Sequence, residues 1–109
     1  MCTFEINNTT WKVELTDKDE NLTVKGKRCK GCTVYKNNTI YIDKAISQEN
    51  QLYVLRHEMT HVVIYETQIE LKEVYSEECL CEMVAMYGEF IINKSKELMD
   101  TLYNMQLQL

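Results

Sequence analysis

Five residues of the chain, His57-Glu58-Met59-Thr60-His61, form the pattern His-Glu-x-x-His, in which two side chains can bind a metal and a third can accept a proton. Residues four apart lie on one face of an α-helix, so His57 and His61 can converge on one zinc ion at ~2.0–2.1 Å each. Glu58 stands ~100° round the helix from His57, where a general base for a metal-bound water belongs. The alternative is a chance match, with the chain's only two histidines packed in a core helix.

A catalytic zinc centre needs at least one protein ligand beyond two histidines. The chain has no third histidine, so a carboxylate or a thiolate must serve. Glu77, Glu78 and Glu82 follow downstream, interleaved with Cys79 and Cys81. In the spacing Glu78-x-x-x-Glu82, one carboxylate can bind the metal while the other, one helical turn away, accepts the remaining N–H of a ligand histidine. A carboxylate from this segment is therefore the expected third ligand.

A β-rich region precedes the motif. Trp11, Val13 and Leu15 alternate with polar residues, which is typical of a half-buried strand. The candidate strand segments are residues 3–6, 11–15, 22–26, 33–36 and 39–43. Between the last two, Asn37-Asn38 favours a tight hairpin because asparagine tolerates positive φ. This region predicts three or four mostly antiparallel strands with one face covered.

The motif itself is expected in a helix from Gln48 to Glu66, with Ser47 as its N-cap. The apolar residues of this helix form one stripe that should pack on the sheet: Leu52, Leu55, Met59, Val62 and Val63. The histidines fall on roughly the opposite side. That side is expected to face a second helix.

The second helix is expected from Ser76 to about Ile92, with a continuation or restart through Met105 as the alternative. Its apolar stripe consists of Leu80, Val84, Tyr87 and Ile91. An acidic loop at residues 67–75 would join the two helices at the rim of the site. Together the elements predict one α+β domain over residues 1–109, with a small antiparallel-rich sheet packed against the motif helix and a C-terminal helix.

The combination of His57-Glu58-x-x-His61 with Glu78-x-x-x-Glu82 resembles the gluzincin arrangement, in which a second helix supplies a ligand and a supporting carboxylate. The layout of about residues 31–92 is similar to the ImmA/IrrE family of small zincin-like metallopeptidases, especially its compact phage- and prophage-encoded members. The resemblance implies His57, His61 and Glu78 as zinc ligands, with Glu82 orienting a ligand histidine from a position where the family has Asp. It also implies a site-specific peptidase that acts on a regulatory protein such as a repressor.

The chemistry expected of such a site is hydrolysis of a peptide bond in a protein or peptide substrate. Zinc lowers the pKa of its bound water toward ~7 and polarises the scissile carbonyl. Glu58 takes the proton and later delivers it to the leaving amine. Tyr35, Tyr41 and Tyr65 are open candidates for stabilising the oxyanion, and a sheet-edge strand can hold an extended peptide. Two alternatives are a zincin-fold protein that sequesters a regulator without cleaving it, and a purely structural metal with Glu58 idle.

The five cysteines raise the question of a second metal site. Cys29-x-x-Cys32 has the spacing of half a zinc ribbon or of a redox pair, and Cys79-x-Cys81 would supply the other half of a ribbon. Because Cys-x-Cys is not the usual second half, ordinary buried thiols are the expectation.

Composition and charge argue against some classes of binding partner and favour one cellular compartment. A net charge of −5, from 17 acidic and 12 basic residues, argues against a nucleic-acid surface. No apolar stretch approaches the ~20 residues of a membrane span. An odd number of cysteines without secretory context favours reduced thiols and a cytoplasmic location.

Overall fold

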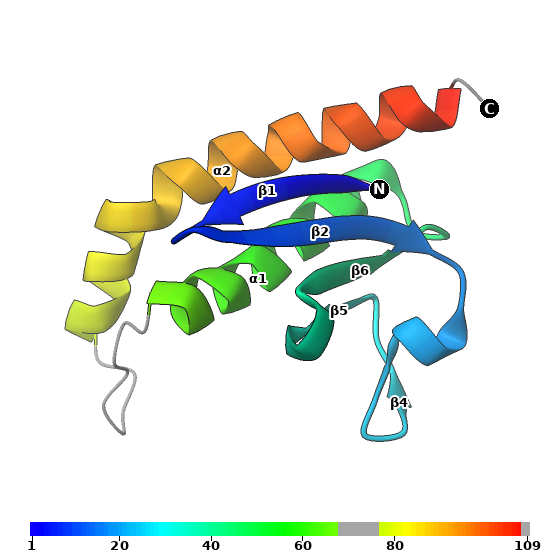
Figure 1. Cartoon of the computed structure of the whole chain (residues 1–109), viewed down its shortest axis with the longest axis horizontal. Coiled ribbons are helices and arrows are strands. Elements are labelled where there is room, and N and C mark those ends of the chain that lie inside the picture. The colour runs from blue at the N-terminus through cyan, green and yellow to red at the C-terminus, as the bar shows by residue number, and fades with distance from the viewer. Residues whose placement is uncertain (68–76, 108–109) are drawn as a thin grey trace.

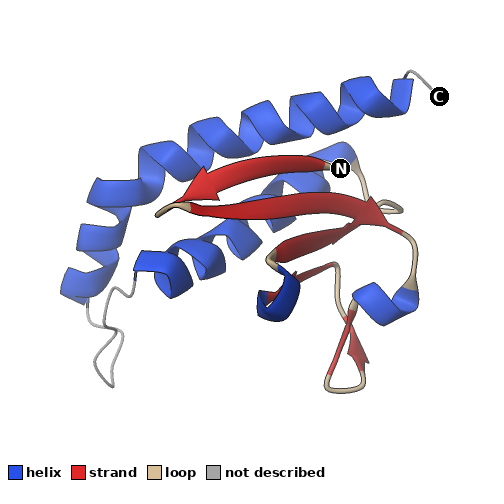
Figure 2. Cartoon of the chain, viewed as in Figure 1, coloured by secondary structure: helices blue, strands red, loops and turns tan. Residues whose placement is uncertain are grey.

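One four-stranded sheet carries both helices of the chain on a single face (Figures 1 and 2). The computed structural model describes residues 1–67 and 77–107. The strands are β1 (Cys2–Ile6), β2 (Thr9–Thr16), β3 (Thr23–Val24), β4 (Lys27–Arg28), β5 (Gly31–Val34) and β6 (Thr39–Asp43). The helices are α1 (Gln48–Thr67) and α2 (Glu77–Leu107), and the short 3-10 turns are η1 (Asp19–Asn21) and η2 (Tyr35–Asn37). The predicted α+β fold class is confirmed.

The main sheet has the strand order β1-β2-β6-β5. β1 and β2 pair antiparallel across a turn at Asn7 and Asn8, whose φ angles of 50° and 65° suit asparagine. β5 and β6 also pair antiparallel, which confirms the predicted hairpin. The tight turn at Asn37-Asn38 is wrong in length, because β5 ends at Val34 and η2 precedes Asn38, whose φ is 51°. The central pair, β2 with β6, is parallel. A parallel pair requires β6 to begin at the same end of the sheet as β2. Residues 17–38 return the chain to that end, because β5 within them runs antiparallel to β6.

The strand predicted at residues 22–26 is wrong in most of its length. Only Thr23–Val24 is a strand, and it pairs with β4 in a separate two-stranded ribbon that projects from the body in Figure 1. Lys25 and Gly26 have φ angles of 52° and 77°, so the chain reverses after two strand residues. Leu22, which alternation placed on this strand, is instead fully buried just after η1.

The core lies between the helices and one face of the sheet. The strands contribute Phe4, Ile6, Trp11, Val13, Ile40 and Ile42 to this face. From α1 come Leu55, Met59, Val62 and Val63, all fully buried, with Leu52 at the margin, so the predicted stripe is confirmed. Ser47 is the N-cap as expected, because its Oγ accepts a hydrogen bond from the backbone N–H of Asn50 at 3.2 Å.

Helix α2 runs past its predicted end at Ile92 and continues through Met105, which was the alternative. Its buried residues lie in the later turns, at Ile91, Ser95, Leu98, Met99 and Leu102, where the helix runs beside β1 (Figure 1). The apolar pattern continues through these turns and no proline interrupts it, so the helix does not stop. The predicted start at Ser76 and residues 68–75 of the predicted loop lie outside the described residues, and Thr67 ends α1.

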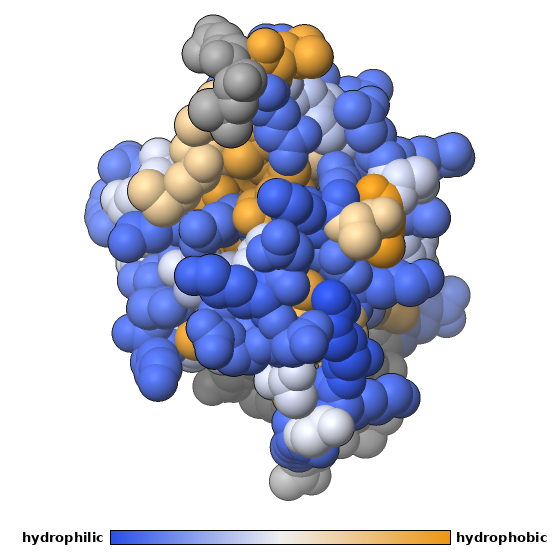
Figure 3. Space-filling model, turned by 90° about the vertical axis from the view of Figure 1, so that its right-hand side faces the viewer, coloured by the Kyte–Doolittle hydropathy of each residue, from blue (hydrophilic) through white to orange (hydrophobic). Residues whose placement is uncertain are grey.

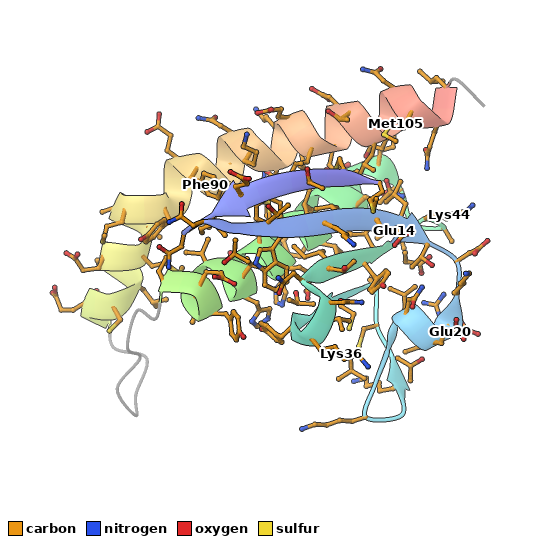
Figure 4. All side chains as sticks on the ribbon, in the orientation of Figure 1. Glu14, Glu20, Lys36, Lys44, Phe90 and Met105 are labelled. Atoms are coloured by element: carbon orange, nitrogen blue, oxygen red, sulfur yellow. The ribbon has the colours of Figure 1, made fainter. Side chains whose placement is uncertain are left out.

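Apolar side chains also gather in a hollow beneath the C-terminal end of α2 (Figure 3). This hollow of about 340 Å³ is lined partly by Leu15, Leu102 and Met105. Glu14 and Lys44 also line it. Figure 4 labels both side chains, together with Met105. Within residues 1–67 and 77–107, no helix is long and apolar enough to cross a membrane.

Candidate metal centre

Helix α1 brings His57, Glu58 and His61 together. One possible ligand atom from each residue lies within 4.8 Å of the other two, and the imidazole centroids are 5.0 Å apart at an interplanar angle of 72°. Both histidines are exposed, and the side chain of His57 is 60% accessible. The four-residue spacing places both imidazoles on one side of the helix, as the motif predicted, and this side faces solvent.

Glu58 occupies a different environment from the histidines that flank it. Its side chain is only 10% exposed, because it points toward β5. Its Oε1 accepts a hydrogen bond from the Thr33 Oγ1 at 2.9 Å, while its Oε2 lies 3.8 Å from the His57 Nε2. Thr33 thus fixes one carboxylate oxygen and leaves the other beside the histidine. Thr33 was not singled out from the sequence, since its closeness to Glu58 depends on how β5 lies over α1.

A glycine allows β5 to approach α1 this closely. A Cβ atom at Gly31 would overlap the Cγ1 of Val54 and would lie 3.3 Å from the Cγ of Glu58. Any side chain at this position would push the strand away from the helix. Gly31 therefore sets the distance between the strand that supplies Thr33 and the helix that supplies the carboxylate.

The predicted carboxylates of the second helix lie apart from this group. Glu78 and Glu82 are described and exposed in the first turns of α2, and neither belongs to the group of possible ligands formed by the histidines and Glu58. The roles of Glu78 as third ligand and Glu82 as supporting carboxylate stay predictions.

The expectation that the histidine side of α1 faces the second helix is wrong, since both imidazoles are exposed. The two helices meet on a neighbouring side of α1, where the Nε of Arg56 donates to the Oγ of Ser95 at 3.0 Å. Ser95 is fully buried among the later turns of α2, and packing of those turns decides which side of α1 is covered.

Tyrosines lie at both ends of the histidine pair. Tyr65 is one helical turn beyond His61, and its ring lies 4.6 Å from that of Tyr35 and 6.3 Å from that of the buried Trp11. Tyr41, the third oxyanion candidate, accepts a hydrogen bond from the Asn37 Nδ2 at 3.5 Å.

At the other end of the pair, Tyr53 is 73% exposed and one turn before His57. Tyr53 was not predicted as a site residue. Its position four residues before His57, on the same face of the helix, is the sequence signal that could have identified it.

A cleft of about 320 Å³ opens beside the group. His57 and Glu58 form one wall with Tyr53 and Val54 of α1, and the opposite wall comes from residues 29–31 at the start of β5. The cleft thus adjoins both the candidate base and a candidate ligand. The wall formed by residues 29–31 includes Lys30, which was also not predicted as a site residue.

Within the described residues the five cysteines form no disulfide, and none belongs to the group of possible metal ligands. Cys32 is buried on β5, and burial raises the pKa of its thiol, with the negative charge of Glu58 as a second cause. Cys79 and Cys81 lie in the first turns of α2. Comparison of the chain with protein families, curated proteins and solved structures gives no match.

Proposed function

We propose that this protein is a zinc-dependent peptidase that hydrolyses a peptide bond in a protein substrate, such as a repressor or another regulator. One observation carries the proposal: two imidazoles and one carboxylate meet within 4.8 Å on a single helix, with the histidines open to solvent and Glu58 held by Thr33. Purely structural zinc sites are closed by four protein ligands, and an exposed histidine pair leaves room for a substrate.

The donor set fits zinc, which takes imidazole nitrogens and carboxylate oxygens. His57 and His61 would hold the ion, and Glu78 remains the proposed third ligand, with Glu82 orienting a ligand histidine. When bound, zinc supplies a Lewis acid that polarises the scissile carbonyl and acidifies water.

Glu58 performs the proton transfers in this proposal. Its Oε1 is occupied by the hydroxyl of Thr33, so its Oε2, on the side of His57, is the oxygen free to accept a proton. Glu58 takes that proton from the attacking water and delivers it to the nitrogen of the leaving amine. Thr33 keeps the carboxylate in one orientation during both transfers.

The main chain of the substrate would lie along β5. This strand is one of the two edges of the main sheet, because β6 is its only sheet neighbour in the described part of the chain. An extended peptide can add to such an edge through backbone hydrogen bonds, and it would then lie beside the histidines and the cleft. Strand addition explains how an exposed site can hold a substrate.

A second candidate function is a zincin-fold protein that binds and sequesters a regulator without cleaving it. The exposed positions of Glu78 and Glu82, outside the group of possible ligands, favour this alternative. In that case the same face of α1 and the edge of β5 would form a binding surface.

Metal analysis together with a proteolysis assay tests the proposal. The wild-type protein is expected to hold one zinc per chain and to cleave an unfolded protein such as casein in a zinc-dependent way. His57→Ala should lose both properties. Lys96→Ala, on the exposed surface of α2, is the matched control and should keep both. A metal-free wild-type protein that still cleaves casein would contradict the proposal.

A further inference from the structure

A short basic segment lies beside the cleft of an otherwise acidic protein. Residues 25–30 contain four of the chain's 12 Lys and Arg residues, while the chain as a whole carries a net charge of −5. These four residues are Lys25, Lys27, Arg28 and Lys30, and all are exposed. They form the turn and second strand of the β3–β4 ribbon and lead directly into β5.

Among the residues that the structure describes, only one of these cations forms an ion pair. Arg28 forms ion pairs with Asp19 at 2.6 Å and with Asp43 at 3.1 Å, which anchor the ribbon to the sheet. Among the described residues, no ion pair includes Lys25, Lys27 or Lys30. Three positive charges therefore remain available to a partner.

Lys30 connects this basic ribbon to the candidate active site. It lines the cleft opposite Tyr53 and Val54, in the same cavity as His57 and Glu58. It is the only Lys or Arg among the described residues of that lining. The cleft thus combines an apolar wall, which suits the stem of a side chain, with a positive charge at its rim, which suits a carboxylate.

We propose that the cleft and the basic ribbon bind an acidic peptide segment, with one Glu or Asp side chain of the substrate at Lys30 and further carboxylates toward Lys27 and Lys25. This inference rests on the proposed peptidase function and deepens it by naming the class of substrate. The surrounding negative charge repels an acidic segment elsewhere on the surface, so attraction at the ribbon orients the segment as it approaches. A peptide suits this place better than a nucleic acid because the edge of β5 pairs with a peptide main chain.

Binding of three labelled peptides tests the inference. The short peptides share one apolar pattern and carry Glu, Gln or Lys at the variable positions, and fluorescence anisotropy measures their affinities for the zinc-loaded Glu58→Gln protein. The Glu peptide should bind about two- to fivefold more tightly than the Gln peptide, since exposed ion pairs are individually weak. The Lys peptide should bind least, and raising the salt from about 0.05 M to about 0.5 M should remove the difference.

Charge reversal at Lys30 provides the decisive comparison. In Lys30→Glu, the difference in affinity between the Glu and Lys peptides should largely disappear, because a negative charge then stands in the cleft while Lys25 and Lys27 remain. In Lys96→Glu, which makes the same charge change on α2, the order should stay as in the parent protein.

Four results would overturn the inference. These are equal affinity for the Glu and Gln peptides, an undiminished preference for the Glu peptide in Lys30→Glu, no binding of any peptide, or tighter binding of a single-stranded oligonucleotide than of the Glu peptide.

Cleavage of casein by the wild-type protein separates this inference from the proposed function. Zinc-dependent cleavage without a preference for the Glu peptide refutes only the proposal of an acidic substrate. A preference for the Glu peptide without zinc-dependent cleavage refutes only the proposal of a peptidase.

Discussion

At the scale of single residues, the motif places neighbouring side chains in opposite environments. His57 projects into solvent, whereas Glu58 is buried beneath β5 and held by Thr33. The buried carboxylate accepts one hydrogen bond and keeps its second oxygen toward the histidines. This arrangement suits a base that must stay oriented while two exposed imidazoles bind an ion.

Glu58→Gln tests whether the carboxylate is a base. Glutamine keeps the size and the acceptor oxygen that Thr33 needs but cannot take up a proton. The variant should keep its fold and its zinc and lose about 10²–10⁴-fold in cleavage rate, which is the usual contribution of a general base. Circular dichroism, metal analysis and the casein assay measure the three properties. A variant that holds zinc and acts in the cell like the wild type would favour sequestration over catalysis.

The third ligand is tested by removing the two carboxylates of α2 separately. Glu78→Ala should strongly reduce zinc occupancy, because it deletes a proposed ligand. Glu82→Ala should weaken zinc binding by only about 10–100-fold, as loss of a supporting carboxylate does. Titration with a competing chelator measures both affinities. If only Glu82→Ala abolished binding, the assignment would be wrong by one helical turn, and if neither had an effect, the third ligand would lie elsewhere.

The thiols provide a separate test of metal stoichiometry. Replacement of Cys29 and Cys32 with Ser should leave the zinc content at one ion per chain, because neither thiol belongs to the group of possible ligands. Metal analysis of the double variant measures this directly. A fall to half the wild-type content would indicate a second, thiolate-bound zinc.

At the scale of elements, the site depends on how closely β5 approaches α1. At Gly31 the strand contributes no side chain to this contact, because the glycine faces the side chains of Val54 and Glu58. The contact places the edge strand, the Thr33 hydroxyl and the cleft beside the histidines. A small change in strand position would alter all three together.

Gly31→Ala and Gly88→Ala form a matched pair that tests this contact. The methyl group at Gly31 would overlap the Cγ1 of Val54, and such overpacking should lower the free energy of unfolding by about 1–3 kcal/mol. The methyl group at Gly88, inside α2, would meet the Cγ1 of Val84 at an ordinary 3.4 Å. That variant should gain roughly 0.5–1 kcal/mol, since alanine favours a helix interior. Urea denaturation measures both, and an unchanged stability in Gly31→Ala would contradict the close approach.

At the scale of the whole molecule, a small sheet is covered on one face by two helices that pack through a single core. The two histidines of the candidate metal site lie outside this core, on the exposed side of α1. The fold therefore does not depend on zinc for its packing. Zinc should nevertheless stabilise the protein, because an ion that binds only the native state shifts the folding equilibrium.

Thermal unfolding measures that stabilisation. At a free zinc concentration about 100 times the Kd, the native state should gain about 2.7 kcal/mol. For a chain of this size, the gain should raise the Tm by roughly 10 °C. His61→Ala should show no zinc-dependent shift but should still unfold cooperatively, because its imidazole lies on the surface. An identical Tm for the wild-type protein with zinc and with a chelator would argue against a specific site.

The features that depend on local geometry could be predicted from the sequence alone. The spacing of His57 and His61 places them together on any α-helix, and the cap at Ser47 and the stripe around Leu55 and Met59 follow from the same helical period. The reversal at Asn38 likewise needs only a residue that tolerates positive φ. Each of these features is set by residues a few positions apart.

How these elements face one another could not be predicted from local geometry and is seen only in the tertiary structure. The burial of Glu58 beneath β5, the parallel pairing of β2 with β6 and the exposure of the histidine side of α1 all depend on contacts between distant segments. Helix α2 illustrates the reason: its later turns, around Ser95, pack beside β1 and Arg56, and this choice leaves the histidines uncovered. A helical period shows which side chains share a face, but the partner of that face is selected by competition among all the apolar surfaces of the chain.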